Sequence, residues 1–252
     1  MFDEPFAQGR TWIHHLDPRA RIIMATAFAL SMALARHLYI AIFGLAVAVL
    51  VLMALRPPCR PLLRRLGAVN VFIFFLAITV PLTMPGTTLW TLGPLHISQE
   101  GLMLVLMVGL KANAIMLVFI AFVATMPVPT LGHALDRLGL SSKLIFLLIF
   151  TYRYIHTLAE EWQRLHTAAR LRCFVPRTGL HTYRTVGHML GMVLVNSSDR
   201  AGRIYQAMLL RGFNGQFTSV RHFVWSTRDS IFSVFWLGVV MMLMATDIFV
   251  EF

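Results

Sequence analysis

Residues 38–55 read LYIAIFGLAVAVLVLMAL, a run of 18 residues without a charged side chain. About 20 apolar residues form a helix long enough to cross the hydrocarbon core of a bilayer, so this run and its flanks can span a membrane. Further apolar runs occur at 22–35, 67–82, about 98–126 and 231–250. The sequence therefore predicts an all-α, polytopic membrane protein with about five transmembrane helices.

The composition of the whole chain also favours a membrane protein. Of its 252 residues, 58% are hydrophobic and 13% are charged, and the mean hydropathy is +0.71. Soluble domains usually contain about 25% charged residues. The two cysteines, Cys59 and Cys173, lie in Arg-rich segments without metal-like spacing, so we expect unpaired cytoplasmic thiols. We also expect no cleavable signal peptide, because charged residues precede the first apolar run.

Two regions depart from this apolar pattern. The Pro-, Gly- and Thr-rich stretch at 81–98, PLTMPGTTLWTLGPLHIS, predicts a loop that leads into a helix capped by Ser98. The region from 127 to 228 has no apolar run of about 20 residues, and its mixed pattern predicts amphipathic helices at 130–138, 141–174 and 182–211. We therefore divide the chain into four transmembrane helices at 1–126, a cytoplasmic set of long amphipathic helices at 127–228 and a C-terminal transmembrane helix at 229–252.

The net charge of +11 comes almost entirely from arginine. With five spans and a cytoplasmic N-terminus, 20 of the 22 Lys and Arg residues fall on the cytoplasmic side. Only Arg36 falls in an outer loop, while Lys111 lies within a span. This asymmetry follows the positive-inside rule and predicts a multi-pass protein with its N-terminus in the cytoplasm. We expect its location to be the bacterial inner membrane. It also accounts for the basic balance without a nucleic-acid partner.

The chain lacks the motifs of ATPases and common membrane enzymes. It has no GxxxxGK[ST], HExxH, CxxC or GxSxG pattern, and no two aspartates lie within four residues of each other. We therefore expect no catalytic residue and no cofactor bound by this chain. A metal site at the adjacent pair His14 and His15 is disfavoured, because neighbouring residues do not share a helix face. For Lys111, near Asn113, a structural role is favoured over a functional contact, since no intramembrane acid is visible.

Two segments at the ends of the long amphipathic helices share four of seven residues. Residues 168–174 read AARLRCF, and residues 207–213 read AMLLRGF. A helix C-cap is one interpretation, because Gly often follows the last turn and a cation there suits the helix dipole. Capping does not explain the shared Ala four residues before each Arg, which leaves that face of the helix thin. A thin end with one guanidinium can enter a groove on a partner and bind a carboxylate through two hydrogen bonds.

Three further stretches accompany these segments: HHLDPRARI at 14–22, QEGLMLVLMVGLKANAI at 99–115 and LGHALDRLGLSSK at 131–143. Together they resemble the T component of energy-coupling factor (ECF) transporters, most closely the CbiQ type of cobalt uptake systems, over nearly the whole chain. The resemblance implies a non-catalytic scaffold in membrane lipid that couples two ABC ATPases, which use ATP, to a separate substrate-binding membrane subunit. It also implies that the ATPase-coupling residues are Ala168, Arg172, Cys173, Ala207, Arg211 and Gly212.

The resemblance implies a mechanism, and the chain differs from the family at one position of the two segments. ATP binding closes the ATPase pair, draws the two helix ends with it and makes the long helices tilt or scissor. Cys173 stands where the family usually has Gly, so we expect a less sharp helix closure at this end, with Arg170 as a competing basic group. Cobalt is the favoured substrate, and nickel or a vitamin are the alternatives.

Three other classes of function stay open. An ordinary ABC importer permease would pair with a second permease and form its own channel. A membrane enzyme would be active without ATPase partners, although the chain lacks catalytic clusters. A nucleic-acid-binding tether would use the basic region, but its Arg residues are spread along helices rather than gathered in one dense patch.

Overall fold

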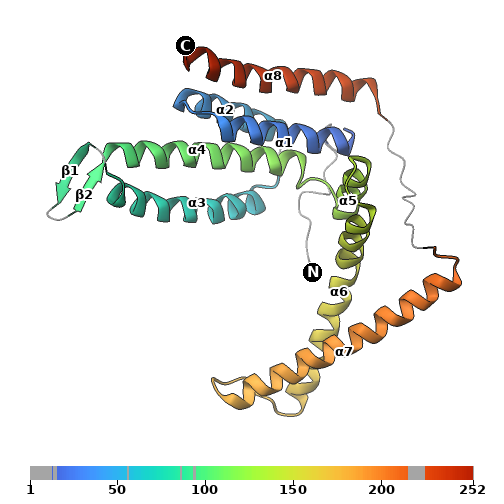
Figure 1. Ribbon diagram of the computed structural model, residues 1–252. Helices are drawn as coiled ribbons and strands as arrows, with labels where there is room; N and C mark the ends of the chain where they lie inside the picture. The colour runs from blue at the N-terminus through green and yellow to red at the C-terminus, as the bar shows by residue number, and fades with distance from the viewer. Residues whose placement is uncertain are drawn as a thin grey trace. The chain divides into compact units, whose positions relative to one another are not determined.

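The computed structural model describes residues 13, 16–55, 57–85, 87–92, 95–214 and 225–251. Within these residues the chain is helical apart from two short strands, so the predicted all-α class is confirmed (Figure 1). In chain order the elements are α1 (Pro18–Leu34), α2 (Leu38–Leu55), α3 (Cys59–Thr83), β1 (Thr88–Leu92), β2 (Leu95–Ser98), α4 (Gln99–Phe122), α5 (Val128–Arg137), α6 (Ser142–Leu171), α7 (Leu180–Leu210) and α8 (Thr227–Glu251).

The described residues divide into two compact units. One comprises residues 135–214, with α6 and α7, and the other comprises the residues up to 134 together with those from 225 onwards. The predicted division at 126 and 228 separates membrane from cytoplasmic parts and stays a prediction. Each unit is described by itself below.

Four helices are long and apolar enough to cross a membrane: α2, α3, α4 and the Thr227–Asp247 part of α8. The first predicted span corresponds to α1, which has 17 residues and is about 26 Å long at 1.5 Å per residue. Its start is fixed by Asp17, whose side chain accepts a hydrogen bond from the backbone N–H of Arg19. Helix α1 is one residue shorter than α2, the shortest of the other four, and packs against α4 and α8, so the five helices that the sequence predicted are all present. The chain is a multi-pass membrane protein.

The stretch predicted as a loop contains a β-hairpin. Strands β1 and β2 pair antiparallel, with Trp90 opposite Ile97 and Leu92 opposite Leu95. The loop was predicted because Pro and Gly residues are frequent in this stretch. The Thr, Trp, Leu and Ile residues between them favour extended backbone, which explains the strands. The predicted N-cap after the hairpin is confirmed, because the Ser98 side chain accepts a hydrogen bond from the N–H of Gly101 at 3.1 Å.

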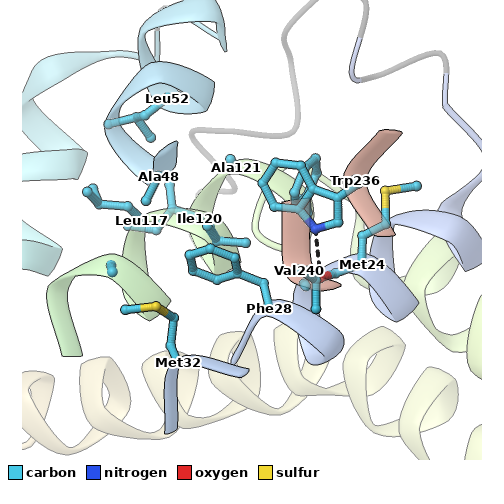
Figure 2. Packing of buried hydrophobic residues seen from close by; sticks show 14 of the residues in the cluster. Met24, Phe28, Met32, Ala48, Leu52, Leu117, Ile120, Ala121, Trp236 and Val240 are labelled. Carbon is cyan, nitrogen blue, oxygen red and sulfur yellow. Dashed lines mark hydrogen bonds between the residues drawn. The ribbon is translucent and has the colours of Figure 1, made fainter. Parts of the chain in front are cut away.

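The apolar core of the bundle forms where α1, α2, α4 and α8 meet (Figure 2). Trp236 of α8 is 2% exposed, and its ring lies 5.8 Å from that of Phe28 and 5.0 Å from that of Phe122. Its indole N–H donates to the backbone oxygen of Met24 at 3.1 Å. Burial of the ring and satisfaction of its one polar atom together fix α8 against α1.

Polar contacts at both ends of α1 set the directions of the helices. At its start, Asp229 of α8 accepts from the backbone N–H of Asp17 at 3.0 Å. Beyond its other end, Asp247 of α8 accepts from the backbone N–H of Arg36 at 3.0 Å. The first helix therefore runs parallel to α8. Near its start, the buried guanidinium of Arg21 donates to the hydroxyl of Thr125, just after α4, so α4 runs antiparallel to both.

The structural role favoured for Lys111 is confirmed. Its ammonium donates to the backbone oxygen of Ala33 at 3.4 Å and also to that of Ala35. These carbonyl groups at the end of α1 lack intrahelical donors, and a cation is favourable at that pole of the helix dipole. A lysine within an apolar helix thus needs no acid partner. Two residues further on, the amide of Asn113 exchanges hydrogen bonds of 3.0 and 3.2 Å with Asn70 of α3.

We expect Lys111→Met to destabilise the bundle, because it leaves the terminal carbonyl groups of α1 without their charged donor. Hydrogen bonds to charged groups contribute about 1.5–3 kcal/mol, so unfolding in detergent should shift down by several degrees. The matched control is Lys143→Met at the chain's only other lysine, which is exposed. Equal unfolding temperatures of the two variants would contradict this role.

Candidate functional site

The candidate site is carried by the two long helices α6 and α7. They have 30 and 31 residues, which corresponds to about 45 Å each, and they cross within one unit (Figure 1). In these helices only Ile145 and Met189 are buried. The long helices predicted in this region are therefore confirmed, and they expose most of their surface.

Helix α6 ends in a Schellman motif, a hydrogen-bonded closure of the last turn. The N–H of Cys173 donates to the oxygen of Arg170 at 3.0 Å, and the N–H of Phe174 donates to the oxygen of Ala169 at 3.1 Å. This pattern satisfies carbonyl groups that have no donor within the helix. The turn therefore closes on its own backbone, and its arginine side chains are not used for closure.

Helix α7 ends in the same way. The N–H of Gly212 donates to the oxygen of Leu209 at 3.0 Å, and the N–H of Phe213 donates to the oxygen of Met208 at 3.1 Å. Each bond joins the same relative positions as at the end of α6. The two seven-residue segments thus have the same backbone hydrogen bonds as well as the same four residues.

The less sharp closure expected at Cys173 is wrong. Cys173 has φ +60°, and Gly212 has φ +81°, so both adopt the left-handed conformation that this closure requires. For an L-residue with a Cβ atom, this conformation costs roughly 1–2 kcal/mol. The first helix end therefore has the same geometry as the second and differs in its conformational energy.

The side chains that the sequence singled out are accessible at both ends. Arg172 and Arg211 are exposed, and so are Ala168 and Ala207 one turn before them on the same face. Cys173 and Gly212 are exposed as well. Within the described part of the chain, neither guanidinium forms a hydrogen bond or an ion pair. Both are available to an acidic group on a partner.

A third helix end shows what closure alone requires. After α5, the N–H of Gly139 donates to the oxygen of Asp136 at 3.1 Å, and the N–H of Leu140 donates to the oxygen of Leu135 at 3.2 Å. Gly139 has φ +94°, so this is again the Schellman arrangement. The position that corresponds to Arg172 is occupied by Leu138. The closure forms without arginine, so capping does not account for the two arginines.

One polar cluster across α6 and α7 was not identified from the sequence. The two carboxylate oxygens of Glu161 accept one hydrogen bond each, from Asn196 at 2.6 Å and from Arg200 at 2.9 Å. A signal was present, because Glu161 lies eleven residues before Arg172, and Arg200 lies eleven residues before Arg211. Its meaning depends on the crossing of the two helices, which spacing alone does not show.

No three His, Cys, Asp or Glu side chains gather into a possible metal site in the part of the chain that the structure describes. The pair His14 and His15 lies outside the described residues. The candidate site thus consists of two exposed helix ends, each with one arginine.

Comparison with known proteins supports a transport role. Residues 9–221 match the CbiQ family, described as "Cobalt transport protein". The energy-coupling factor transporter transmembrane protein EcfT of Leuconostoc gelidum subsp. gasicomitatum is 24% identical over 219 residues, and that of Thermosediminibacter oceani is 26% identical over 226 residues. These matches cover 82% and 83% of both chains, respectively. The nickel permease LarQ of Lactiplantibacillus plantarum is 27% identical over 200 residues, which cover 79% of this chain and 67% of LarQ. The resemblance to T components of ECF transporters is thereby confirmed, and the chain belongs to the CbiQ family.

Proposed function

We propose that this chain is the transmembrane coupling subunit of an ECF-type importer. It transmits ATP-driven motion of two cytoplasmic ABC ATPases to a separate substrate-binding membrane subunit. The observation that carries this proposal is the pair of identically closed helix ends, each with an exposed arginine, Arg172 or Arg211, that has no partner among the residues that the structure describes. The names of the EcfT relatives support the same class of assembly.

Two equivalent helix ends fit two equivalent partner surfaces. Each end combines a thin face at Ala168 or Ala207 with one guanidinium that has no partner among the described residues. An acidic groove on each ATPase would accept such an end and bind the guanidinium through two parallel hydrogen bonds. An ATPase pair offers two copies of one groove, which this arrangement requires.

The proposed mechanism is mechanical. When ATP binding closes the ATPase pair, the two helix ends move with it, and α6 and α7 tilt or scissor. Backbone hydrogen bonds keep each helix straight over about 45 Å, so displacement of one end is carried along its length. The substrate-binding subunit packed on these helices reorients in the membrane. ATP is bound by the partners, and this chain supplies neither a cofactor site nor a catalytic group.

The proposed location follows from the charges. Twenty of the 22 Lys and Arg residues lie on one side when α1 is counted as a fifth span and the N-terminus is placed in the cytoplasm. The positive-inside rule then puts residues 127–228 in the cytoplasm of a bacterial cell, below the inner membrane, where ATPases can reach them.

We infer Co²⁺ as the substrate from the description of the family, "Cobalt transport protein". Nickel is the alternative, because one relative is a nickel permease. Uptake of radioactive Co²⁺ and Ni²⁺ by cells that produce the complete transporter tests this choice, with competition by the unlabelled ions. Uptake of neither ion would favour a vitamin.

The double variant Arg172→Ala, Arg211→Ala tests the coupling function. We expect it to lose metal uptake and to weaken ATPase attachment by about a hundredfold to ten-thousandfold, since it removes two charged contacts of about 1.5–3 kcal/mol each. Attachment is measured by co-purification and by titration of the ATPases. Arg170→Ala is the matched control at an exposed arginine two residues away. Normal assembly and uptake in the double variant would contradict the proposal.

The composition of the purified complex separates this function from that of an ordinary permease. An ordinary permease would purify with a second permease, whereas the proposed function predicts one copy of this chain for two ATPases.

The variant Cys173→Gly tests the energy difference between the two ends. Because glycine adopts the left-handed conformation without a Cβ clash, we expect a more stable last turn of α6 by about 1 kcal/mol. Hydrogen exchange at the amide of Phe174 should slow by about fivefold, while ATPase attachment is retained. The reciprocal variant Gly212→Cys should speed exchange at Phe213. Unchanged exchange in both variants would show that the Cβ atom costs nothing here.

A further inference from the structure

The contact between α6 and α7 centres on one carboxylate. Glu161 binds Asn196 through one oxygen and Arg200 through the other, at 2.6 and 2.9 Å. The side chains of Glu161 and Arg200 are 15% and 32% exposed, so the pair is largely shielded from water. A partly buried, charge-assisted hydrogen bond is stronger than an ion pair on the surface. In two helices with so few buried residues, this cluster fixes where they cross.

The cluster lies at equal distance from both helix ends. The segment from Glu161 to Arg172, here the α6 arm, and the segment from Arg200 to Arg211, the α7 arm, each extend eleven residues. At 1.5 Å per residue, both arms are about 16 Å long. The helices run antiparallel, because Phe146 near the start of α6 and Met208 near the end of α7 line the same cavity. The two arms therefore point in opposite directions from the cluster.

An apolar cavity of about 300 Å³ separates the α7 arm from the first half of α6. Its wall includes Phe146, Phe150 and Tyr154 from α6, and Ala201, Ile204 and Met208 from α7. The spacing of three and four residues places each set along one helix face. The cavity therefore leaves space between the facing side chains of the two helices. The α7 arm can approach α6 there without breaking a backbone hydrogen bond.

We propose that Glu161, Arg200 and Asn196 form the pivot of α6 and α7, and that the adjacent cavity gives the α7 arm room to move. These are positioning residues: they contact neither ATP nor the transported substrate. With the pivot intact, displacement of one helix end becomes rotation about a fixed point. Without it, the helices slide along each other, and ATPase motion is no longer converted into movement of the membrane subunit. The inference rests on the proposed coupling function.

The first experiment separates a pivot from a simple contribution to stability. In the complete transporter in proteoliposomes, Glu161→Arg and Arg200→Glu are each expected to reduce metal uptake by about tenfold, while ATPases stay attached and hydrolyse ATP. The exchanged pair, Glu161→Arg with Arg200→Glu, should restore uptake to within about threefold. The matched control is Glu160→Arg, since Glu160 is 67% exposed and forms a weak surface pair with Arg164 at 3.9 Å.

Three outcomes would overturn the pivot. They are full uptake in the single variants, loss of ATPase attachment in them, or no recovery in the exchanged pair. Failure of the proposed function is a different result, because it shows as normal attachment and uptake in the double variant of Arg172 and Arg211. The two inferences are thus tested separately.

A second experiment tests the cavity without touching the charges. Ala201→Phe fills the cavity, whereas Gly202→Phe adds the same side chain next to it, where a Cβ atom has no neighbour within 4 Å. Spin labels attached through non-canonical amino acids at the exposed positions Thr167 and Gln206, which leave Cys59 and Cys173 unchanged, report the distance between the arms. Nucleotide binding should change this distance in the parent transporter and in Gly202→Phe, and not in Ala201→Phe. Equal distance changes in both variants would overturn the role of the cavity.

Discussion

The last carbonyl groups of an α-helix have no donor within the helix, and the way they are satisfied decides which cations of this chain stay free. At the end of α1, Lys111 donates to Ala33 and Ala35 and is thereby used inside the bundle. At the ends of α6 and α7, backbone N–H groups take over that role. Arg172 and Arg211 are therefore left exposed, which is the condition for a partner to bind them.

The two units are stabilised by different interactions. The unit that contains α1, α4 and α8 buries an aromatic cluster around Trp236. Close packing of this kind leaves little freedom for the helices to shift. In the other unit, α6 and α7 bury one residue each and are joined through the carboxylate of Glu161. Few apolar contacts and one localised polar contact support the proposed rotation of the two helices. A body that resists deformation and a pair of helices that can rotate are both needed for mechanical coupling.

Features that depend on residues close together in the sequence were predictable from the sequence. Long apolar runs predicted the membrane helices, and the two segments with Arg172 and Arg211 marked the helix ends. The contact between Glu161 and Arg200 joins residues on two helices, so it depends on where the helices cross. Local rules also misled at Cys173, where the preference for glycine suggested a different closure. The tertiary structure accepts the strained conformation because the same two backbone hydrogen bonds form.

The helix ends of α5, α6 and α7 share the Schellman motif, and they show that closure of the last turn is independent of the arginine that a partner would bind. The end of α5 has Leu138 at the position of the arginines and closes with the same bonds, so closure is a property of the backbone. The ends of α6 and α7 present the same exposed residue types, and they differ in the energy of one left-handed residue, by roughly 1–2 kcal/mol. Terminal turns open with free energies close to zero. A difference of this size therefore changes how often the end of α6 is formed, rather than which surface it binds. Two similar ATPase grooves are thus compatible with two helix ends of unequal stability.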